Sequence, residues 1–309
     1  MHIRVANAPV SWGVLEFDDM IGGGGPWHQV LDEMAETGYV GTELGDFGYL
    51  PTDPPHLIAE LSSRGLAMLG AFIPVELRNP DAIAPACTLA VEVATLLAAV
   101  ATPESAPGPF IVLSDDNGCD PVRTANAGRV CPEMHLTPAE WQHLVTNAEV
   151  FARTVRDATG LRTVFHHHSA GFVETPAEID EFLDATDPTL IGLVFDTGHF
   201  VYGAGTDHSD PADFIRAHRD RIWHVHFKDC HPAVAAEART TELDYFEALR
   251  RGVFCELGRG EVDFPEVLAA LQEIGYDGWI VVEQDVLPGM GTPRESALRN
   301  REYLRAIGL

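Results

Sequence analysis

Eight short runs rich in β-branched and aromatic residues recur along the 309-residue chain, and each is followed by a longer segment with the hydrophobic period of a helix. We expect strands at Ile3–Ala8, Val40–Leu44, Ala67–Ile73, Phe110–Ser114, Thr163–His168, Gly192–Asp196, Ile222–Phe227 and Trp279–Glu283. Regular alternation of this kind is typical of parallel βα units. Eight units with no Pro/Ser-rich linker and no shift of composition predict one closed (β/α)8 TIM barrel, a single domain over residues 1–309.

The expected helices carry recognisable start signals. They span Pro26–Thr37, Pro55–Arg64, Asp81–Ala101, Pro138–Thr159, Pro176–Ala185, Pro211–Arg219, Phe264–Ile274 and Glu295–Ile307. Two of them open with Thr-Pro-Ala-Glu, at Thr137 and at Thr175, which is the pattern of a capping box. An open doubly wound sheet is the alternative fold, but the glycine run Gly22–Gly25 lies well after the first strand and lacks the GxGxxG spacing of a nucleotide-binding turn.

The charge balance excludes one class of partner. The chain carries 47 acidic against 20 basic residues, a formal charge of -27, and no Lys/Arg-rich stretch offsets it locally. Such a surface repels phosphate backbones, so we expect no nucleic-acid partner.

Other features bear on the compartment. Five cysteines without a CxxC pair favour a reducing environment. The first ten residues have no long apolar core, so we expect no signal peptide. The most apolar stretch, Cys87–Ala101, contains Glu92 and is too short to cross a bilayer. These features predict a cytoplasmic protein with no membrane partner. They are compatible with a homo-oligomer as well as with a monomer.

Polar residues cluster where the predicted strands end, which in a barrel is the catalytic face. Five of the eight strand ends carry them: Glu43, the run His166–His168, Asp196, His226 with Lys228, and Glu283. Strand alternation puts His166 and His168 on one face and His167 on the other. We assign His167 and His224 to structural hydrogen bonds.

Two further patterns concern the metal chemistry of these ends. The sequence Asp196-Thr197-Gly198-His199 predicts a sharp turn at its glycine, which would bring His199 back over the pocket. A hard divalent cation needs an oxygen-rich set with one nitrogen, and four residues near strand ends supply it: Glu174, Asp196, His226 and Glu283. The chain therefore reads as a metalloenzyme.

Several motifs together resemble the inosose dehydratases, or 2-keto-myo-inositol dehydratases, of myo-inositol catabolism. They are NAPVSWGV, GTELG, HHHSAGFVET, FDTGHF, HVHFKD, GEVDF and GYDGWIVVEQD, and the similarity runs from about residue 5 to about residue 305. The wider group is the xylose isomerase-like barrel superfamily, which includes ketose 3-epimerases and endonuclease IV.

The resemblance implies metal ligands at Asp196, His226 and Glu283. Many relatives place a glutamate directly at the end of the fifth strand, where this chain has three histidines. Either Glu174 folds back to the metal from the loop, or His168 or His166 substitutes. We expect Glu174, with the histidines lining the substrate pocket.

The reaction that the resemblance implies is elimination of water from a cyclic keto-polyol such as 2-keto-myo-inositol (scyllo-inosose), through an enolate, to a trihydroxycyclohexane-dione. Mn²⁺ or Co²⁺ is the expected ion, with Mg²⁺ or Zn²⁺ as alternatives. The expected roles are bases at Glu283 or Glu174, acids at His199 or His168, charge stabilisation by Lys228, and a substrate wall that includes Trp12, Glu43 and His166.

Two rival functions stay open. A ketose 3-epimerase or sugar isomerase uses the same metal and enolate but returns the proton to carbon. A non-catalytic sugar-binding barrel is a rival from another class, although a binder has no need of acids and bases around a cation. The charge of -27 argues against DNA cleavage of the endonuclease IV type, which needs a basic surface facing DNA.

Overall fold

A computed structural model describes residues 2–13, 25–207, 209–287 and 289–309. Its main sheet is parallel throughout, with the order β3-β2-β1-β11-β8-β7-β6-β5-β4. The strands are β1 (Arg4–Asn7), β2 (Gly41–Thr42), β3 (Ala67–Met68), β4 (Gly70–Pro74), β5 (Phe110–Ser114), β6 (Arg162–His166), β7 (Ile191–Asp196), β8 (Ile222–Phe227) and β11 (Trp279–Val282). The expected glycine run Gly22–Gly25 lies, except for Gly25, outside the described residues.

The sheet closes into a barrel because β3 and β4 are two pieces of one strand, separated only by Leu69. The first piece pairs with β2 and the second with β5. Leu69 itself bridges both neighbours: its N–H donates to the carbonyl of Thr42, and its carbonyl accepts from the N–H of Phe110. The predicted strand Ala67–Ile73 is therefore the seam of the ring, and the predicted (β/α)8 barrel is confirmed.

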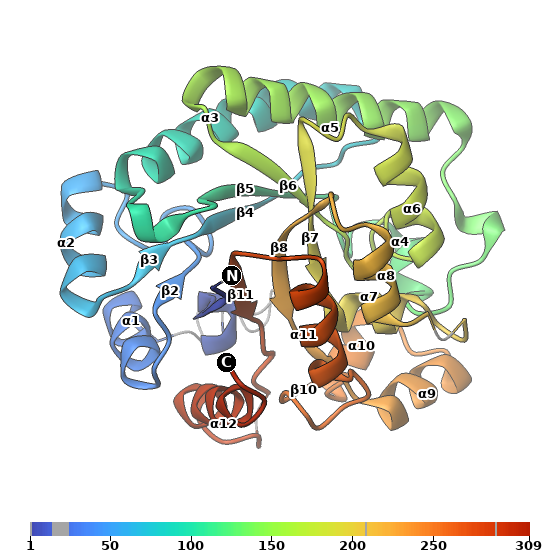
Figure 1. Ribbon diagram of the computed structural model, residues 1–309. Coiled ribbons are helices and arrows are strands. Elements are labelled where there is room, and N and C mark those ends of the chain that lie inside the picture. Colours follow the sequence, from blue (N-terminus) through green and yellow to red (C-terminus); the bar gives the residue numbers. More distant parts are fainter. Residues whose placement is uncertain (1, 14–24, 208, 288) are drawn as a thin grey trace.

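Helices ring the outside of the strands (Figure 1). The main ones are α1 (Trp27–Glu36), α2 (Pro54–Arg64), α3 (Ile83–Val100), α5 (Pro138–Thr159), α6 (Pro176–Ala185), α8 (Pro211–Ala217), α11 (Phe264–Glu273) and α12 (Pro293–Ala306). Both predicted capping boxes form, since Thr137 and Thr175 each accept from the N–H of a glutamate three residues later. These local signals place the helix starts to within a residue or two.

The connections between the main strands and helices contain elements that the hydrophobic pattern did not predict. They are α4 (Pro121–Ala125), α7 (Thr197–Gly203), α9 (Pro232–Thr241), α10 (Tyr245–Arg250), the antiparallel pair β9 (Asp229–Cys230) and β10 (Phe254–Cys255), and the short 3-10 helices η1 (Pro9–Trp12), η2 (Pro80–Ala82), η3 (Pro103–Ser105) and η4 (Pro132–Met134). Most of these pieces build the rim above the carboxyl ends of the strands.

The turn expected at Gly198 is instead the first turn of α7. Asp196 is the N-cap of this helix, and its Oδ1 accepts from the N–H of His199 at 2.8 Å. Glycine is required at 198 by crowding, because an added Cβ would lie 2.7 Å from Cγ of Lys228. The helix therefore starts directly at the catalytic face of the barrel.

Helix α3 is the one described helix that is long and apolar enough, together with η2 before it, to meet a length-and-composition test for a membrane span. It packs against α2, α5 and β4 as a member of the outer ring. Its buried side chains, such as Val93 and Leu97, belong to the hydrophobic core between the helices and the barrel.

Candidate active site

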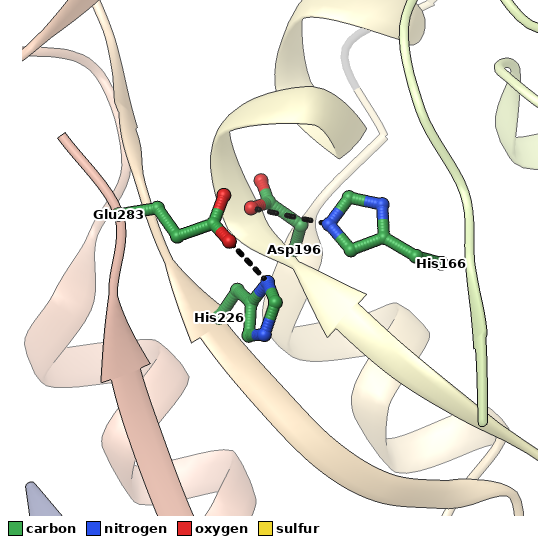
Figure 2. A group of neighbouring side chains, drawn as sticks. All are labelled: His166, Asp196, His226 and Glu283. Carbon is green, nitrogen blue, oxygen red and sulfur yellow. Dashed lines mark ion pairs between the residues drawn. The ribbon is translucent and has the colours of Figure 1, made fainter. Parts of the chain in front are cut away.

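Four side chains converge at the carboxyl ends of neighbouring strands: His166, Asp196, His226 and Glu283 (Figure 2). One possible ligand atom of each lies within 4.8 Å of those of the other three. Oδ2 of Asp196 is 3.9 Å from Nε2 of His166, and Nδ1 of His226 is 3.1 Å from Oε1 of Glu283. The three expected ligands Asp196, His226 and Glu283 are thus brought together, and the fourth member of the group is His166.

Strand order explains this convergence. The four residues lie on or directly after β6, β7, β8 and β11, which are consecutive in the sheet. The register pairs Asp196 with His226 across β7 and β8. Because parallel strands end on the same rim, side chains far apart in sequence share one small volume.

The group meets the requirements of a divalent cation site. Asp196, His166 and His226 are almost fully buried. Oδ2 of Asp196 has no hydrogen-bond partner among the described residues. An unpartnered buried carboxylate oxygen is costly unless a cation neutralises it. Two imidazoles and two carboxylates form a mixed N/O donor set that suits first-row divalent ions.

The surroundings set the protonation of these groups. Burial raises the pKa of Asp196 to about 6, against the attraction of Lys228. Burial and the neighbouring His226 lower the pKa of His166 well below its usual range, so this ring is neutral at pH 7. Burial opposes the charge of His226 too, but Glu283 and Glu43 outweigh it and raise the pKa of His226 well above its usual range.

Glu43, which follows β2, holds His226 from the opposite side. Its Oε1 lies 3.0 Å from Nε2 of His226 and 2.9 Å from Nε2 of His224. Although burial would raise it, the two histidines lower the pKa of Glu43 to about 2, so the carboxylate is ionised and accepts both N–H groups. If a metal ion displaces the proton on Nδ1, the proton held on Nε2 by Glu43 would leave the Nδ1 lone pair for the ion, the arrangement by which carboxylates orient metal-binding histidines. His224 has the structural role expected for it.

Glu174 does not join the cluster, contrary to expectation. Its carboxylate is fully buried in the loop after β6, where it accepts from the N–H of Gly128 at 2.6 Å and of Ala170 at 2.7 Å. Nη2 of Arg123 lies 4.0 Å from Oε2 of Glu174. Burial raises the pKa of Glu174 to about 7 despite Arg123. Backbone donors and a buried arginine from the preceding βα connection satisfy this carboxylate, so a strand-end histidine takes the fourth position.

His168 and His199 stack with ring centroids 3.8 Å apart, and Ser169 contacts both. Nδ1 of His168 donates to the carbonyl of Ser169 at 2.7 Å, because a carbonyl can only accept. Nδ1 of His199 accepts from the N–H of Ser169 at 3.3 Å and lies 3.0 Å from Oγ of Ser169. Ser169 therefore contacts one ring nitrogen of each imidazole. His168 also lines a cavity beside the cluster, whereas His199 is not among its lining residues.

Lys228 lies on the rim after β8 and is the only lysine in the sequence. Its Nζ is 3.4 Å from Oε2 of Glu283 and 3.5 Å from Oδ2 of Asp285, and it stands 4.8 Å from the ring centroid of Phe254. The side chain is 4 % exposed. A buried ammonium held by two carboxylates is positioned to donate to an oxygen of a bound ligand.

A cavity of about 160 Å³ opens onto the cluster. At roughly 10–15 Å³ per water it holds on the order of ten waters, enough room for a ligand of about a dozen non-hydrogen atoms. The residues that line it are Ala8, Pro9, Val10, Glu43, Gly45, Asp46, Phe72, His166, His168, Lys228 and Glu283. The lining thus combines carboxylates and imidazoles with the apolar side chains of Ala8, Pro9, Val10 and Phe72.

Trp12, expected on the substrate wall, lies elsewhere. It is buried in the core beside α1, and its indole N–H donates to Oε2 of Glu33 at 2.7 Å. Residues just before it in the same segment, Ala8 to Val10, line the cavity instead. Within the NAPVSWGV motif, the first half rather than Trp12 therefore lines the cavity.

Sequence reasoning missed Ser169, Asp46 and Phe72 at or beside the site. Asp46 sits on a loop and Phe72 in the middle of β4, so neither has a periodic signal. One signal was available for Lys228 beyond its strand-end position: it is a solitary lysine among 309 residues, next to a predicted metal ligand.

With the fold and the cluster described, comparison with known proteins identifies the family. Residues 112–307 match the family described as xylose isomerase-like TIM barrel. The protein belongs to this family. Inosose dehydratase of Geobacillus kaustophilus (strain HTA426) is 33% identical over 306 residues, which cover 97% of this chain and 93% of that protein. Inosose dehydratase of Lacticaseibacillus casei is 33% identical over 308 residues, covering 99% and 97%. Within the xylose isomerase-like barrels, the chain belongs with the inosose dehydratases.

Several solved structures share the fold of this chain. The probable 3-DHS dehydratase AsbF from Bacillus anthracis superposes with a TM-score of 0.69 at 13% identity, covering 98% of this chain and 99% of that one. The IOLI protein with a binding zinc atom gives 0.67 at 15% identity, covering 99% and 98%. L-ribulose 3-epimerase gives 0.68 at 16% identity, covering 99% and 94%. At these identities the likeness shows the fold alone.

Proposed function

We propose that this protein is a metal-dependent hydro-lyase that eliminates water from a cyclic keto-polyol such as 2-keto-myo-inositol. The observation that carries the proposal is the combination of inosose dehydratase relatives along nearly the whole chain with a four-residue donor set beside one small cavity. The acidic lining of that cavity supports an uncharged substrate. Lys228, the one lysine or arginine among the described residues that line it, is already paired with carboxylates.

His166, Asp196, His226 and Glu283 would hold the ion. A divalent ion there supplies Lewis acidity toward a ketone oxygen, which acidifies the neighbouring C–H bond. The donor set has two nitrogens rather than the one expected from the sequence, and this favours ions that bind imidazole well. We propose Co²⁺, Mn²⁺ or Zn²⁺ ahead of Mg²⁺.

The other cavity residues would divide the proton transfers of the elimination. His168 carries its proton on Nδ1, so Nε2 is the atom that can take the proton from the carbon beside the ketone. Lys228 would donate to the departing β-hydroxyl, which leaves as water. Its ammonium would also stabilise negative charge on oxygen. The electron pair of the broken C–H bond ends in the new C=C bond, and the enol product tautomerises to the dione.

A ketose 3-epimerase is the second candidate, because L-ribulose 3-epimerase has the same fold and such chemistry would start from the same proton abstraction. Incubation with 2-keto-myo-inositol and Co²⁺, Mn²⁺ or Zn²⁺ in D₂O, followed by mass spectrometry, separates the two. Loss of water supports the dehydratase. Incorporation of solvent deuterium without loss of water supports the epimerase, and an unchanged substrate with every ion contradicts both.

A further inference from the structure

The loop after β6 contains a peptide unit that is hydrogen-bonded at both ends. Its N–H, from Ala170, donates to Oε2 of Glu174 at 2.7 Å. Its C=O, from Ser169, accepts from Nδ1 of His168 at 2.7 Å. A buried carboxylate is thus joined to a cavity-lining imidazole through a single peptide group.

We propose that Glu174 is a positioning residue that fixes the tautomer and orientation of His168 through the Ser169–Ala170 peptide. Above pH 7, where Glu174 with its pKa of about 7 is ionised, the hydrogen bond from the Ala170 N–H to its carboxylate is charge-assisted. It pushes electron density toward the carbonyl at the other end of the same peptide, which makes that oxygen a stronger acceptor. The stronger acceptor keeps the proton on Nδ1 of His168, so Nε2 is the ring nitrogen that carries no proton.

The backbone is bent to make this connection. Ala170 has a φ of 65°, in the left-handed region that residues other than glycine seldom occupy. Such a conformation persists only where the surroundings hold it. Here the carbonyl of Ala170 accepts from the N–H of Gly118 while its own N–H is held by Glu174. The unfavourable conformation is what turns the peptide N–H toward the carboxylate.

Glu174 is in turn held independently of the metal cluster. Its second oxygen, Oε1, accepts from the N–H of Gly128 at 2.6 Å. Arg123, fully buried, lies 4.0 Å from Oε2 and makes a two-point ion pair with Glu178. Two βα connections therefore lock the carboxylate in place, which is the arrangement expected of a residue that orients another group.

The expected effect of Glu174 on kcat rests on the proposed function, whereas the tautomer of His168 can be measured without it. We would prepare ¹⁵N-histidine-labelled protein loaded with Zn²⁺, which is diamagnetic, and record two-bond ¹H–¹⁵N correlations at constant pH. A His168→Gln variant assigns the ring. The wild type should show His168 with its proton on Nδ1. A proton on Nε2 in the wild type would overturn the proposal without any further variant.

Glu174→Gln tests the connection itself. Its amide group cannot accept from both N–H groups, so the proton of His168 should redistribute toward Nε2, and kcat should fall about 10–100-fold with little change in KM, as for other orienting partners. Metal content should stay at the wild-type level. Loss of the metal would instead make Glu174 a ligand, and an unchanged tautomer would contradict the relay.

Glu256→Gln is the matched control, because it changes a glutamate that is paired with another arginine, Arg299, in a different connection of the barrel. It should lower the thermal stability while the tautomer of His168 stays as in the wild type.

If Glu174→Gln does not fold, Glu174→Asp keeps the charge but shortens the reach, and should give a mixed tautomer. A protein that keeps this coupling but does not dehydrate 2-keto-myo-inositol would refute the proposed function alone.

Discussion

Nε2 of His226 lies 3.0 Å from Oε1 of Glu43, while Nδ1 of the same ring lies 3.1 Å from Oε1 of Glu283. The imidazole is therefore clamped between a carboxylate that faces the cluster and one that stands behind it. This relationship gives the two glutamates different tasks: Glu283 faces the cluster, while Glu43, expected on the substrate wall, holds the ring of His226 from the other side.

Replacing Glu43 with Gln should weaken metal binding without removing a ligand. The amide is a poorer acceptor for the Nε2–H of His226, so the ring is less well oriented and less basic, and the dissociation constant for Zn²⁺ or Co²⁺ should rise about 10–100-fold. Isothermal titration calorimetry measures it. Glu33→Gln, which alters a partner of Trp12 in the core, should leave the affinity unchanged. Equal losses in both variants would show a general folding defect.

Metal binding should release protons near neutral pH. In the metal-free protein Glu283 and Glu43, against the effect of burial, raise the pKa of His226 well above its usual range, so the ring is charged at pH 7. Ligation requires neutral imidazole, so about one proton leaves with each ion, and affinity rises with pH. His166 contributes little because burial already keeps it neutral. Calorimetry in two buffers of different ionisation enthalpy counts the protons, and a count of zero would contradict the expectation.

Lys228→Met should slow the reaction far more than it weakens substrate binding. The methionine fills a similar volume but cannot donate a proton or stabilise an oxyanion, so kcat should fall roughly 10²–10³-fold with a small change in KM. Steady-state kinetics with 2-keto-myo-inositol measures both constants. Lys228→Arg, which keeps the charge, should retain more activity than Lys228→Met. A fall in metal content in either variant would point to the ion pair with Glu283 instead.

Gly198→Ala should destabilise the fold at the start of α7. The new methyl group would lie 2.7 Å from Cγ and 2.9 Å from Cβ of Lys228, so the helix or the rim must shift. Overpacking of this kind costs about 1–3 kcal/mol in the free energy of unfolding. Urea denaturation measures the cost. Gly25→Ala, where the nearest contact is 3.6 Å away on a flexible glutamine, should be close to wild type.

The strands were predictable because barrel strands are short apolar runs whose ends carry polar residues. Asp196, His226 and Glu283 each sit at such an end, and parallel pairing brings neighbouring ends together. The place of Glu174 was not predictable. It depends on the left-handed bend at Ala170 and on N–H donors and an arginine from a connection some fifty residues earlier, which leave no periodic pattern.

The predictions for Trp12 and Gly198 were wrong for related reasons. A tryptophan just after the first strand can point toward the cavity or toward the surrounding helices, and the contact with Glu33 of α1 places Trp12 in the core. At Gly198 the Asp-Thr-Gly sequence predicted a turn, but Asp196 also caps a helix, and the need for a small residue came from Lys228 on the next strand. Contacts between distant segments decided both cases.

The solitary lysine has a practical consequence outside catalysis. Because Lys228 is the only lysine in the sequence and is 4 % exposed, the surface offers reagents no ε-amino group. Succinimidyl dyes, amine cross-linkers and glutaraldehyde would find no lysine on the outside of the molecule. Immobilisation or fluorescent tagging is better directed to the exposed thiol of Cys119. An ε-amine that does become reactive would report directly on an opened active site.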